Sequence, residues 1–421
     1  MPTLIDTIQS NLKDVCLNHC TPGRVNSAPR IVTRLNTTIS IDAHGLQSLY
    51  NVTQALGVQR PQIASNYSEE YIENKLIDII ITCHSLPTAT LDSQLRKEIR
   101  SLIIKLQNTV ESWVLFVPII NLKFVNFRKF SIGLVDLYDV NFNTIKYLQS
   151  KFKTKIGHQS TRKTFSELSD QGIAVLAIAK VEAGEIGKAK TKAVSTVESA
   201  LNVLRLYNFT SKFGTQREFY GAFWDEALYW KNLTTSSVGS SFKALSIPQV
   251  HAFKLDKTML KLIRKHQLSD FNRLLTRSPP TKLESKLLTS IHWYGLAIKD
   301  AQEVDKFVKL IVSLEALLLN KNDKFKKHLL ADRAAFILGK DKDAREKIFD
   351  LITKSYSLRG DIVHEGILDF SNEETENLLS VLRALIFKMA KLSEKVSDLE
   401  EISKKIKETK FGSQVKTLLT N

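Results

Sequence analysis

Residues 113–125 read WVLFVPIINLKFV, and residues 130–140 read FSIGLVDLYDV. Both stretches are short and rich in Val, Ile, Leu and Phe, and the polar residues 126–129 separate them, which predicts two strands joined by a turn. A third apolar stretch, residues 172–180, predicts another strand, and a long helix is expected to follow it at about residues 189–207. A strand that leads into a helix is typical of an α+β domain. We therefore expect an α+β domain in the middle of the chain.

Helical patterns lie on both sides of this domain. In residues 69–83, and again in residues 91–110, apolar side chains recur every three to four positions, which predicts two packed amphipathic helices. The pattern returns after Pro279-Pro280, the clearest interdomain signal in the chain, and continues almost to the end. The predicted fold class is therefore α+β and multidomain. Its predicted segments are a helical N-terminal region at 1–110, a basic mixed α/β domain at 111–279, an all-α helical bundle at 280–395 and a C-terminal helix or tail at 396–421.

Length and composition exclude several classes of protein. The chain has 421 residues, which suits two or three domains, and its 43% hydrophobic and 25% charged residues exclude a fibrous or low-complexity protein. No window approaches 18 uninterrupted apolar residues, and residues 1–14 lack the basic and apolar regions of a signal peptide. The three cysteines cannot form a disulfide framework and fit a reducing compartment. We therefore expect a cytoplasmic protein that makes no membrane contact.

The net charge of +16 is concentrated in two stretches. Residues 121–165 sum to +7 and residues 248–290 to +6, whereas residues 291–390 are neutral overall. A regional basic surface favours a polyanionic partner, most simply nucleic acid, and the alternative is a surface that only keeps the protein soluble. The candidate nucleic-acid-binding residues are Lys151, Lys153, Lys155, Arg162, Lys163, Lys261, Arg264 and Lys265.

One short segment combines charged and apolar side chains in a pattern that suggests chemistry. Residues 356–366 read YSLRGDIVHEG, in which Arg359 and His364 flank the apolar pair Ile362-Val363. We expect this pair to anchor the segment in the core, and we expect the preceding helix to place Arg359 near its C-terminal end. A glycine on each side of His364 would allow sharp backbone turns there.

This segment and the helices before it resemble the HEPN domain family, in particular its Apea-like branch. The resemblance covers about residues 282–391, and its diagnostic element is the family's Arg-x(4 to 6)-His motif, which Arg359 and His364 match with four residues between them. The stretches that carry it are SKLLTSIHWYGLAIKDAQEVDKFVKLIVSLEALLL at 285–319, LADRAAFILG at 330–339 and SYSLRGDIVHEG at 355–366.

The resemblance implies a bundle of four or five helices and a metal-independent endoribonuclease, an RNA-cleaving effector of a bacterial anti-phage defence or toxin-type system. In that chemistry an RNA 2′-hydroxyl attacks its adjacent phosphate. His364 would move protons near neutral pH, and Arg359 would stabilise the negative charge that gathers on the phosphate. No metal or cofactor is expected. The family's usual dimer implies a homodimer through the C-terminal domain, in which two Arg359/His364 pairs face each other.

Four further residues are candidates to support this site. Glu315 and Arg333 match polar positions of the family and could orient the site, or they could form a structural ion pair between helices. Tyr356 and Asp361 belong to the same segment. Gly360 departs from the family, because many catalytic members carry Asn, Asp, His or Ser directly after the arginine. The alternative function is therefore a non-catalytic HEPN module that binds nucleic acid or a nucleotide, or that dimerises.

Overall fold

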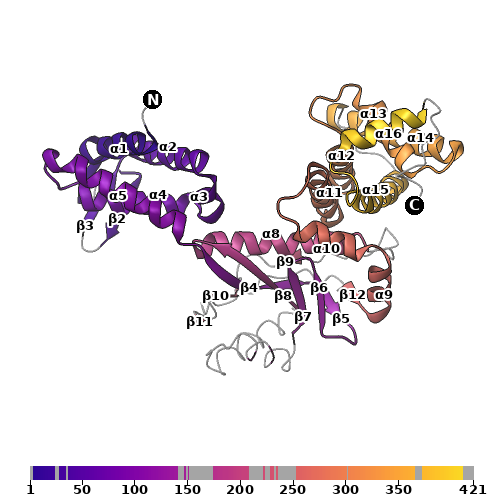
Figure 1. Cartoon of the computed structure of the whole chain (residues 1–421), viewed down its shortest axis with the longest axis horizontal. Helices are drawn as coiled ribbons and strands as arrows, with labels where there is room; N and C mark the ends of the chain where they lie inside the picture. Colours follow the sequence, from indigo (N-terminus) through magenta and orange to yellow (C-terminus); the bar gives the residue numbers. More distant parts are fainter. Residues whose placement is uncertain are drawn as a thin grey trace. The chain divides into compact units, whose positions relative to one another are not determined.

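The computed structural model shows a mixed α+β protein in which helices predominate and the C-terminal region is helical (Figure 1). The chain divides into two compact units. The first unit comprises Met1–Leu115, Lys180–Ala193 and Tyr229–Ser236, and the second comprises Phe116–Ala179, Val194–Leu228 and Ser237–Asn421. The structure describes residues 3–23, 28–34, 37–140, 147, 150, 174–207, 221–222, 228–231, 234–235, 253–300, 302–365 and 372–410. None of the helices within these ranges combines the length and the apolar character needed to cross a membrane.

Amphipathic helices with a shared apolar core form most of the first unit. The helices predicted at 69–83 and 91–110 are confirmed as α4 and α5, and they pack against each other through residues such as Leu76 and Leu95, both fully buried. Polar side chains begin several of these helices, because an N-cap oxygen satisfies a free backbone N–H. Ser68, for example, accepts a hydrogen bond from the Tyr71 N–H at 3.2 Å. The helices are α1 (Leu4–Asp14), α2 (Ala43–Gln59), α3 (Pro61–Asn66), α4 (Glu69–Cys83) and α5 (Thr88–Asn108).

A small sheet in the first unit was missed by the sequence interpretation, which expected helices there. The strands β1 (Cys20–Pro22), β2 (Arg30–Arg34) and β3 (Thr37–Ile41) form an antiparallel sheet in the order β1-β3-β2. Ile39 and Ile41 of β3 are fully buried in the core of the unit. Strands this short offer too few alternating residues for a period of two to stand out.

The middle of the chain folds into a seven-stranded sheet. Its strand order is β11-β10-β4-β8-β7-β6, and β9 pairs with β4. The neighbours β6, β7 and β8 are antiparallel, with Leu137 of β7 opposite Phe130 of β6 and Ala177 of β8. The strands are β4 (Glu111–Ile120), β6 (Lys129–Ile132), β7 (Val135–Asp139), β8 (Val175–Ala183), β9 (Gly221–Ala222), β10 (Leu228–Lys231) and β11 (Thr234–Thr235).

The two apolar stretches that predict single strands are each broken into two. Asn121, with φ 56°, ends β4, and the chain continues as β5 (Leu122–Phe124), which leaves the large sheet and pairs in parallel with β12 (Phe253–Leu255). Gly133, with φ 57°, makes the turn between β6 and β7, where a side chain would come within 2.6 Å of Leu275 Cβ. Asn and Gly are the residues that adopt this left-handed backbone at least cost. The turn predicted at 126–129 is present, and Asn126 there has φ 63°.

The helix expected after the third predicted strand is confirmed as α8 (Ile186–Arg205), which follows β8. Two short helices come later, α9 (Lys257–Lys265) and α10 (Leu268–Thr276). Their inner faces are apolar, and Ile263 of α9 and Phe271 of α10 are fully buried. The sequence pattern also predicts strands and turns at residues 213–230 and 237–247. These residues lie mostly outside the described ranges, which include β9 and β10 of the first stretch.

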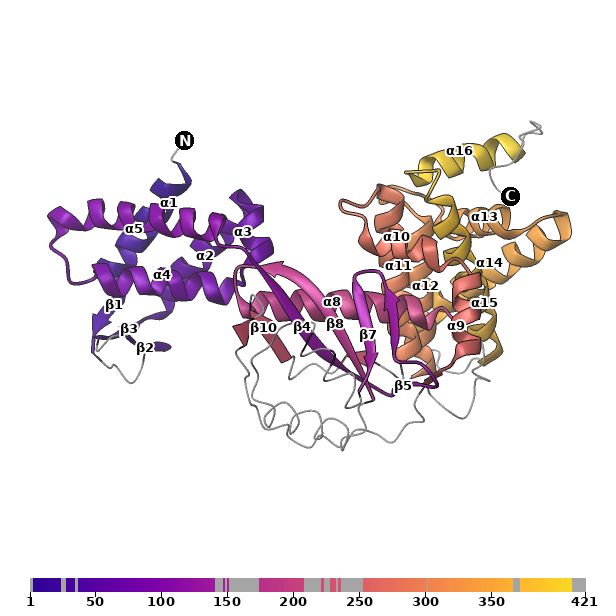
Figure 2. The same ribbon diagram turned by 60° about the horizontal axis from the view of Figure 1, so that its bottom comes forward.

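The C-terminal helices of the second unit pack around α15, which contacts α11, α12, α13 and α14 (Figure 2). The inner side of α15 is apolar apart from Thr375, and Leu382 and Ile386 at its centre are fully buried. The helical pattern that begins after Pro279-Pro280 is confirmed, and its apolar stripes at residues 283–294 and 307–318 lie on α11 and α12. The six helices are α11 (Lys282–Lys299), α12 (Glu303–Leu318), α13 (Lys326–Leu338), α14 (Lys342–Glu365), α15 (Asn372–Leu392) and α16 (Leu399–Lys410).

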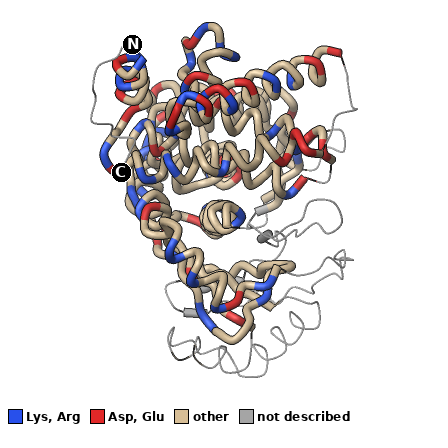
Figure 3. Tube along the Cα trace, turned by 90° about the vertical axis from the view of Figure 1, so that its right-hand side faces the viewer, with Lys and Arg blue, Asp and Glu red and all other residues tan. Residues whose placement is uncertain are grey.

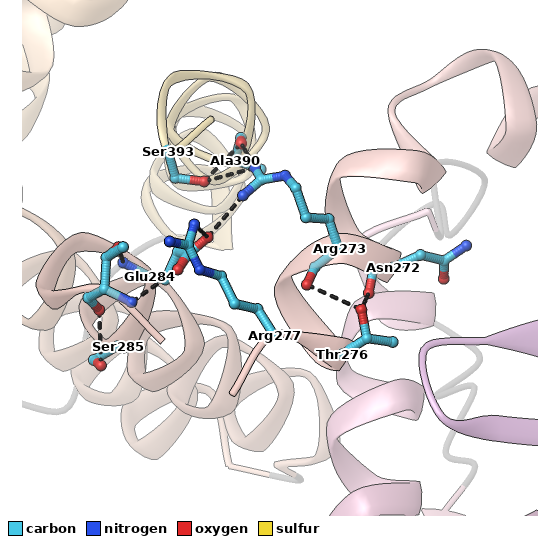
Figure 4. Close-up of polar contacts among 9 residues, drawn as sticks. Asn272, Arg273, Thr276, Arg277, Glu284, Ser285, Ala390 and Ser393 are labelled. Atoms are coloured by element: carbon cyan, nitrogen blue, oxygen red, sulfur yellow. Dashed lines mark hydrogen bonds and ion pairs between the residues drawn. The ribbon is translucent and has the colours of Figure 1, made fainter. Parts of the chain in front are cut away.

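A buried carboxylate, that of Glu284, joins α10, α11 and the end of α15 (Figure 4). Glu284 is fully buried and accepts hydrogen bonds from Arg273 Nη1 at 2.7 Å and Arg277 Nη1 at 3.3 Å. Arg273 Nη2 also donates to the Ala390 carbonyl and to Ser393 Oγ, both at 3.1 Å. The predicted boundary at Pro279-Pro280 therefore lies between two helices that share buried polar contacts.

Burial alone would raise the pKa of Glu284, but hydrogen bonds from Thr281 and the charges of Arg277 and Arg273 lower this pKa below its ordinary value. We expect Glu284→Gln to lower the free energy of unfolding by about 2 kcal/mol at pH 7, because it leaves two guanidinium groups without their counter-charge. The matched control Glu346→Gln removes a carboxylate that pairs with Lys342 on the surface of α14, where both side chains are exposed, and should cost less than about 1 kcal/mol.

The effect of Glu284→Gln should depend on pH. A carboxyl whose pKa is lowered by folding contributes fully above its unfolded-state pKa of about 4.3, and this contribution is lost as the pH falls through the folded-state value. The difference between wild type and Glu284→Gln should therefore shrink at acid pH, measured by urea unfolding followed by circular dichroism. A difference that grows on acidification would contradict the assignment.

Candidate functional site

Arg359 and His364 both lie on α14, which runs without interruption from Lys342 to Glu365. Gly360 is therefore helical, and the prediction of a sharp turn at this residue is wrong. Among the described residues, a Cβ atom at Gly360 would meet nothing within 4 Å, so no described segment approaches closely enough to require the glycine. The second glycine of the motif, Gly366, lies outside the described residues.

The apolar pair between Arg359 and His364 anchors the segment through only one of its members. Ile362 is buried, with 8% of its surface exposed, whereas Val363 is 50% exposed. Successive side chains on a helix are about 100° apart, so the residue after a buried one can face solvent at the edge of the buried side. The expectation that both anchor the segment is therefore wrong for Val363.

The two motif residues differ in their surroundings. His364 is exposed in the last turn of α14, and the described residues give it no hydrogen-bond partner. Arg359 is half-buried, and its Nε is buried without a hydrogen-bond partner in the part of the chain that the structure describes. Residues five apart on a straight helix are about 140° apart around the axis, so the two side chains leave α14 in different directions. One helix therefore does not direct both groups at the same point.

Tyr356 and Glu315 form a contact one turn before Arg359. The Tyr356 hydroxyl on α14 donates to Glu315 Oε1 on α12 at 2.9 Å. Burial and the Glu315 carboxylate raise the pKa of Tyr356, while the nearby positive charge of Arg359 acts in the opposite direction. The structure thus brings Glu315, Tyr356 and Arg359 into one polar cluster, as a supporting role for the first two would require. Asp361 follows in the next turn and is half-buried.

Arg333 belongs to a different group of contacts. It is buried, pairs with Asp323 through Nη1 at 2.6 Å and also donates to the Leu318 carbonyl at the end of α12. Burial alone would raise the pKa of Asp323, but hydrogen bonds from the Asn320 N–H and Arg333 lower it overall. The sequence suggested a structural ion pair between Arg333 and Glu315. This prediction is wrong, because Arg333 pairs with Asp323 instead.

The predicted nucleic-acid-binding residues are only partly described. Lys261, Arg264 and Lys265 are exposed on α9, whose opposite side buries Leu260 and Ile263. Over the C-terminal helices in Figure 3, basic and acidic residues are interspersed, in line with the neutral sum of residues 291–390. The remaining candidates, Lys151, Lys153, Lys155, Arg162 and Lys163, lie outside the described residues.

A further basic surface lies on α5 in the first unit, where no binding residue was predicted. It is a shallow groove of about 740 Å³ along one side of the helix. The charge count missed it because Asp92 and Glu98 offset the basic residues in the sequence, whereas the helix separates them in space. The groove is lined by Ser93, Arg96, Lys97, Arg100, Ser101, Ile104, Lys105 and Asn108.

No family model, curated protein or solved structure matches the chain. Among the residues that the structure describes, no three His, Cys, Asp or Glu side chains are grouped so that they could hold a metal ion. The end of α14 offers instead an exposed imidazole, which can transfer protons near neutral pH, and a guanidinium group, which can bind phosphate oxygens through two parallel donors.

Gly360→Ala tests whether α14 is continuous. Alanine favours a helix over glycine, and the space beside Gly360 is open, so the free energy of unfolding should rise by about 0.5–1 kcal/mol. The matched control is Gly295→Ala in α11, where the new Cβ would lie 1.9 Å from the buried Asn202 Oδ1 and should destabilise the protein by about 1–3 kcal/mol. Urea unfolding measures both. Destabilisation by Gly360→Ala would show that the glycine has a backbone role.

Proposed function

We propose that this chain is a metal-independent endoribonuclease of the HEPN type, an RNA-cleaving effector of a bacterial anti-phage defence or toxin-type system. One observation carries the proposal. The last two turns of α14, within the helical C-terminal region, present the exposed His364 and the guanidinium group of Arg359, whose buried Nε has no hydrogen-bond partner among the described residues. These two groups supply proton transfer and charge stabilisation, which phosphodiester cleavage requires.

The reaction can be written with the His364 and Arg359 side chains of two chains. The His364 imidazole removes the proton of a ribose 2′-hydroxyl, and the 2′-oxygen forms a bond to the adjacent phosphorus. Arg359 stabilises the negative charge that accumulates on the phosphate oxygens. The bond from phosphorus to the 5′-oxygen then breaks, and that oxygen must receive a proton from an acid. The products are a 2′,3′-cyclic phosphate and a 5′-hydroxyl, and DNA is not a substrate because it lacks the attacking group.

A homodimer would provide what one chain lacks. A single site has one imidazole, whereas the reaction uses both a base and an acid. In addition, Arg359 and His364 leave α14 about 140° apart, which favours convergence between two chains over convergence within one. A twofold symmetric dimer through the C-terminal helices would place two copies of each residue near the axis.

The polar contact between Glu315 and Tyr356 lies one turn before Arg359 and would hold this part of the site in place. The Tyr356 hydroxyl is fixed by Glu315 at 2.9 Å, which holds α12 against α14 directly before the motif. Glu315 and Tyr356 would thus position Arg359, and Asp361 offers a carboxylate near His364. RNA would be held by the basic residues of α9, Lys261, Arg264 and Lys265, together with Lys151, Lys153, Lys155, Arg162 and Lys163.

The alternative is a HEPN module that binds nucleic acid or a nucleotide, or dimerises, without cutting. Gly360 favours it, because catalytic members of the family often carry a polar residue at this position. Incubating the purified chain with labelled single-stranded RNA, with and without EDTA, separates the two functions. Cleavage that persists in EDTA supports the enzyme, and binding without cleavage supports the module.

His364→Ala should lower the rate of RNA cleavage by about 10²–10⁴-fold, the usual contribution of a general acid or base, while the melting temperature stays unchanged because the side chain is exposed. Arg359→Lys should lower the rate by about tenfold or more, since an ammonium group cannot make a two-pronged phosphate contact. His292→Ala is the matched control, because His292 is an exposed histidine on α11, away from the motif in the sequence. Equal rates for wild type and His364→Ala would refute the assignment.

The dimer makes a separate prediction. When wild-type chains are mixed with His364→Ala chains, activity should fall below the value expected from dilution, because heterodimers hold an incomplete pair of imidazoles. Light scattering gives the oligomeric state, and a titration of mutant into wild type gives the activity curve. A monomer that cleaves RNA at full rate would contradict the composite site.

A further inference from the structure

The aromatic side chain of Phe325 is exposed to solvent. It is 84% exposed, which exceeds the exposure of the other exposed large apolar residues among those described. It lies at the start of α13, at the end of the loop that follows α12, and its backbone has φ 53° and ψ 44°. A bulky residue in this left-handed conformation costs about 1–2 kcal/mol, so both its exposure and its backbone are unfavourable for stability alone.

The loop that carries Phe325 is held in place by buried contacts. Asp323 accepts a hydrogen bond from the Asn320 N–H at 2.8 Å and pairs with Arg333 at 2.6 Å. Arg333 also binds the Leu318 carbonyl, which ties the loop to the end of α12. The position of Phe325 is therefore set by its neighbours in the loop, although its own ring is not packed against the core.

The residues around Phe325 are basic. Four lysines and one acidic residue occupy positions 321–327, and that acid, Asp323, is already paired with Arg333. The lysines form no ion pair with any residue in the described ranges, and all but Lys327 are exposed. They are Lys321, Lys324, Lys326 and Lys327. A solvent-exposed ring among unpaired cations suits an anionic partner that also offers flat apolar surfaces.

The loop that carries Phe325 connects α12 to α13, and both of these helices pack against α14, the helix of Arg359. The helices α13 and α14 form an antiparallel hairpin, in which Arg345 stacks over Phe336 and His328 stacks on Phe349. Continuing this register from His328 and Phe349 places the start of α13 beside the middle of α14, before Arg359. The last turns of α12, directly before the loop, contact Tyr356 through Glu315. The basic loop therefore lies on the same group of helices as the motif of α14, between two helices that both contact α14.

We propose that Phe325 is a stacking platform for an unpaired base of single-stranded RNA, and that Lys324, Lys326 and Lys327 bind the flanking phosphates. A base offers its face to an aromatic ring only when it is unpaired, which favours single strands over duplex RNA. The inference rests on RNA being the ligand in the proposed function, but it does not depend on cleavage. It adds a subsite that holds the strand beside Arg359 and His364.

Binding is measured with the full chain carrying His364→Ala, which keeps the RNA intact, by fluorescence anisotropy of a labelled single strand of about 12 nucleotides. Phe325→Ala should weaken binding by about tenfold, Phe325→Leu by a similar factor, and Phe325→Trp by much less, because only the aromatic ring stacks. Duplex RNA should be affected little by all three. Replacing the three lysines together by alanine should reduce the salt dependence, the slope of log K against log salt, by about 2.

Tyr50→Ala is the matched control, because Tyr50 is a 49% exposed aromatic residue on α2 of the first unit. It should leave RNA affinity unchanged. Unchanged affinity in Phe325→Ala would overturn the inference, and so would equal affinity of Phe325→Leu and wild type. Loss of dimerisation without loss of RNA affinity would identify the surface as a protein interface and also overturn it.

The two proposals fail in distinguishable ways. If the wild-type chain cleaves RNA but affinity does not depend on Phe325, the stacking platform is wrong and the ribonuclease stands. If affinity depends on Phe325 but no RNA is cut, the ribonuclease is wrong and the platform stands. If the intact chain binds no single-stranded RNA at low salt, the platform is wrong, and the cleavage assay alone decides the enzyme.

Discussion

The arrangement of the second unit depends on one buried charge, the carboxylate of Glu284. Burying a carboxylate is costly unless charged and hydrogen-bonding partners surround it, and here Arg273, Arg277 and Thr281 meet that requirement. Because Arg273 also binds the Ala390 carbonyl, the same interaction fixes the end of α15 relative to α11. The helices α12, α13 and α14 all pack on α15. Arg359 and His364 lie on α14, which packs on α15. The contacts of Glu284 and Arg273, made on α10 and α11, therefore help to set the position of both residues.

The parts of the fold that were predicted correctly are those in which burial imposes a period on the sequence. The helices α4, α5, α11 and α12 each bury one apolar stripe, and a stripe is visible in the residues themselves. The breaks at Asn121 and Gly133 could not be predicted in the same way, because apolar residues continue on both sides of each. Only the backbone angle changes there, and it is set by which strand the next segment pairs with. A local sequence pattern does not show which distant segment a strand will pair with.

In the candidate site, too, local patterns were predicted and tertiary contacts were not. The sequence singled out Arg359 and His364 and proposed Tyr356 and Glu315 as supporting residues, and the structure shows that these two contact each other one turn before Arg359. The sequence could not reveal that α14 continues through Gly360. Glycine is compatible with both a turn and a helix, and the neighbouring helices decide between them. Arg333 was matched to the wrong partner, since its acidic neighbour Asp323 follows α12 in a loop rather than lying within a helix. Phe325 stood out only when its exposure was known, because its residue type suggests a core position.

The parallel pairing of β5 with β12 has a consequence for how the chain folds during its synthesis. Residues 122–124 meet residues 253–255, so β5 has no partner until the whole intervening segment has left the ribosome. During that interval the apolar side chains of Leu122 and Phe124, both buried in the finished protein, remain accessible to solvent and to chaperones. Closing so long a loop is slow, because the entropy of the intervening chain must be lost before the pairing is gained. Synthesis of the C-terminal helices can therefore be well advanced before β5 and β12 come together.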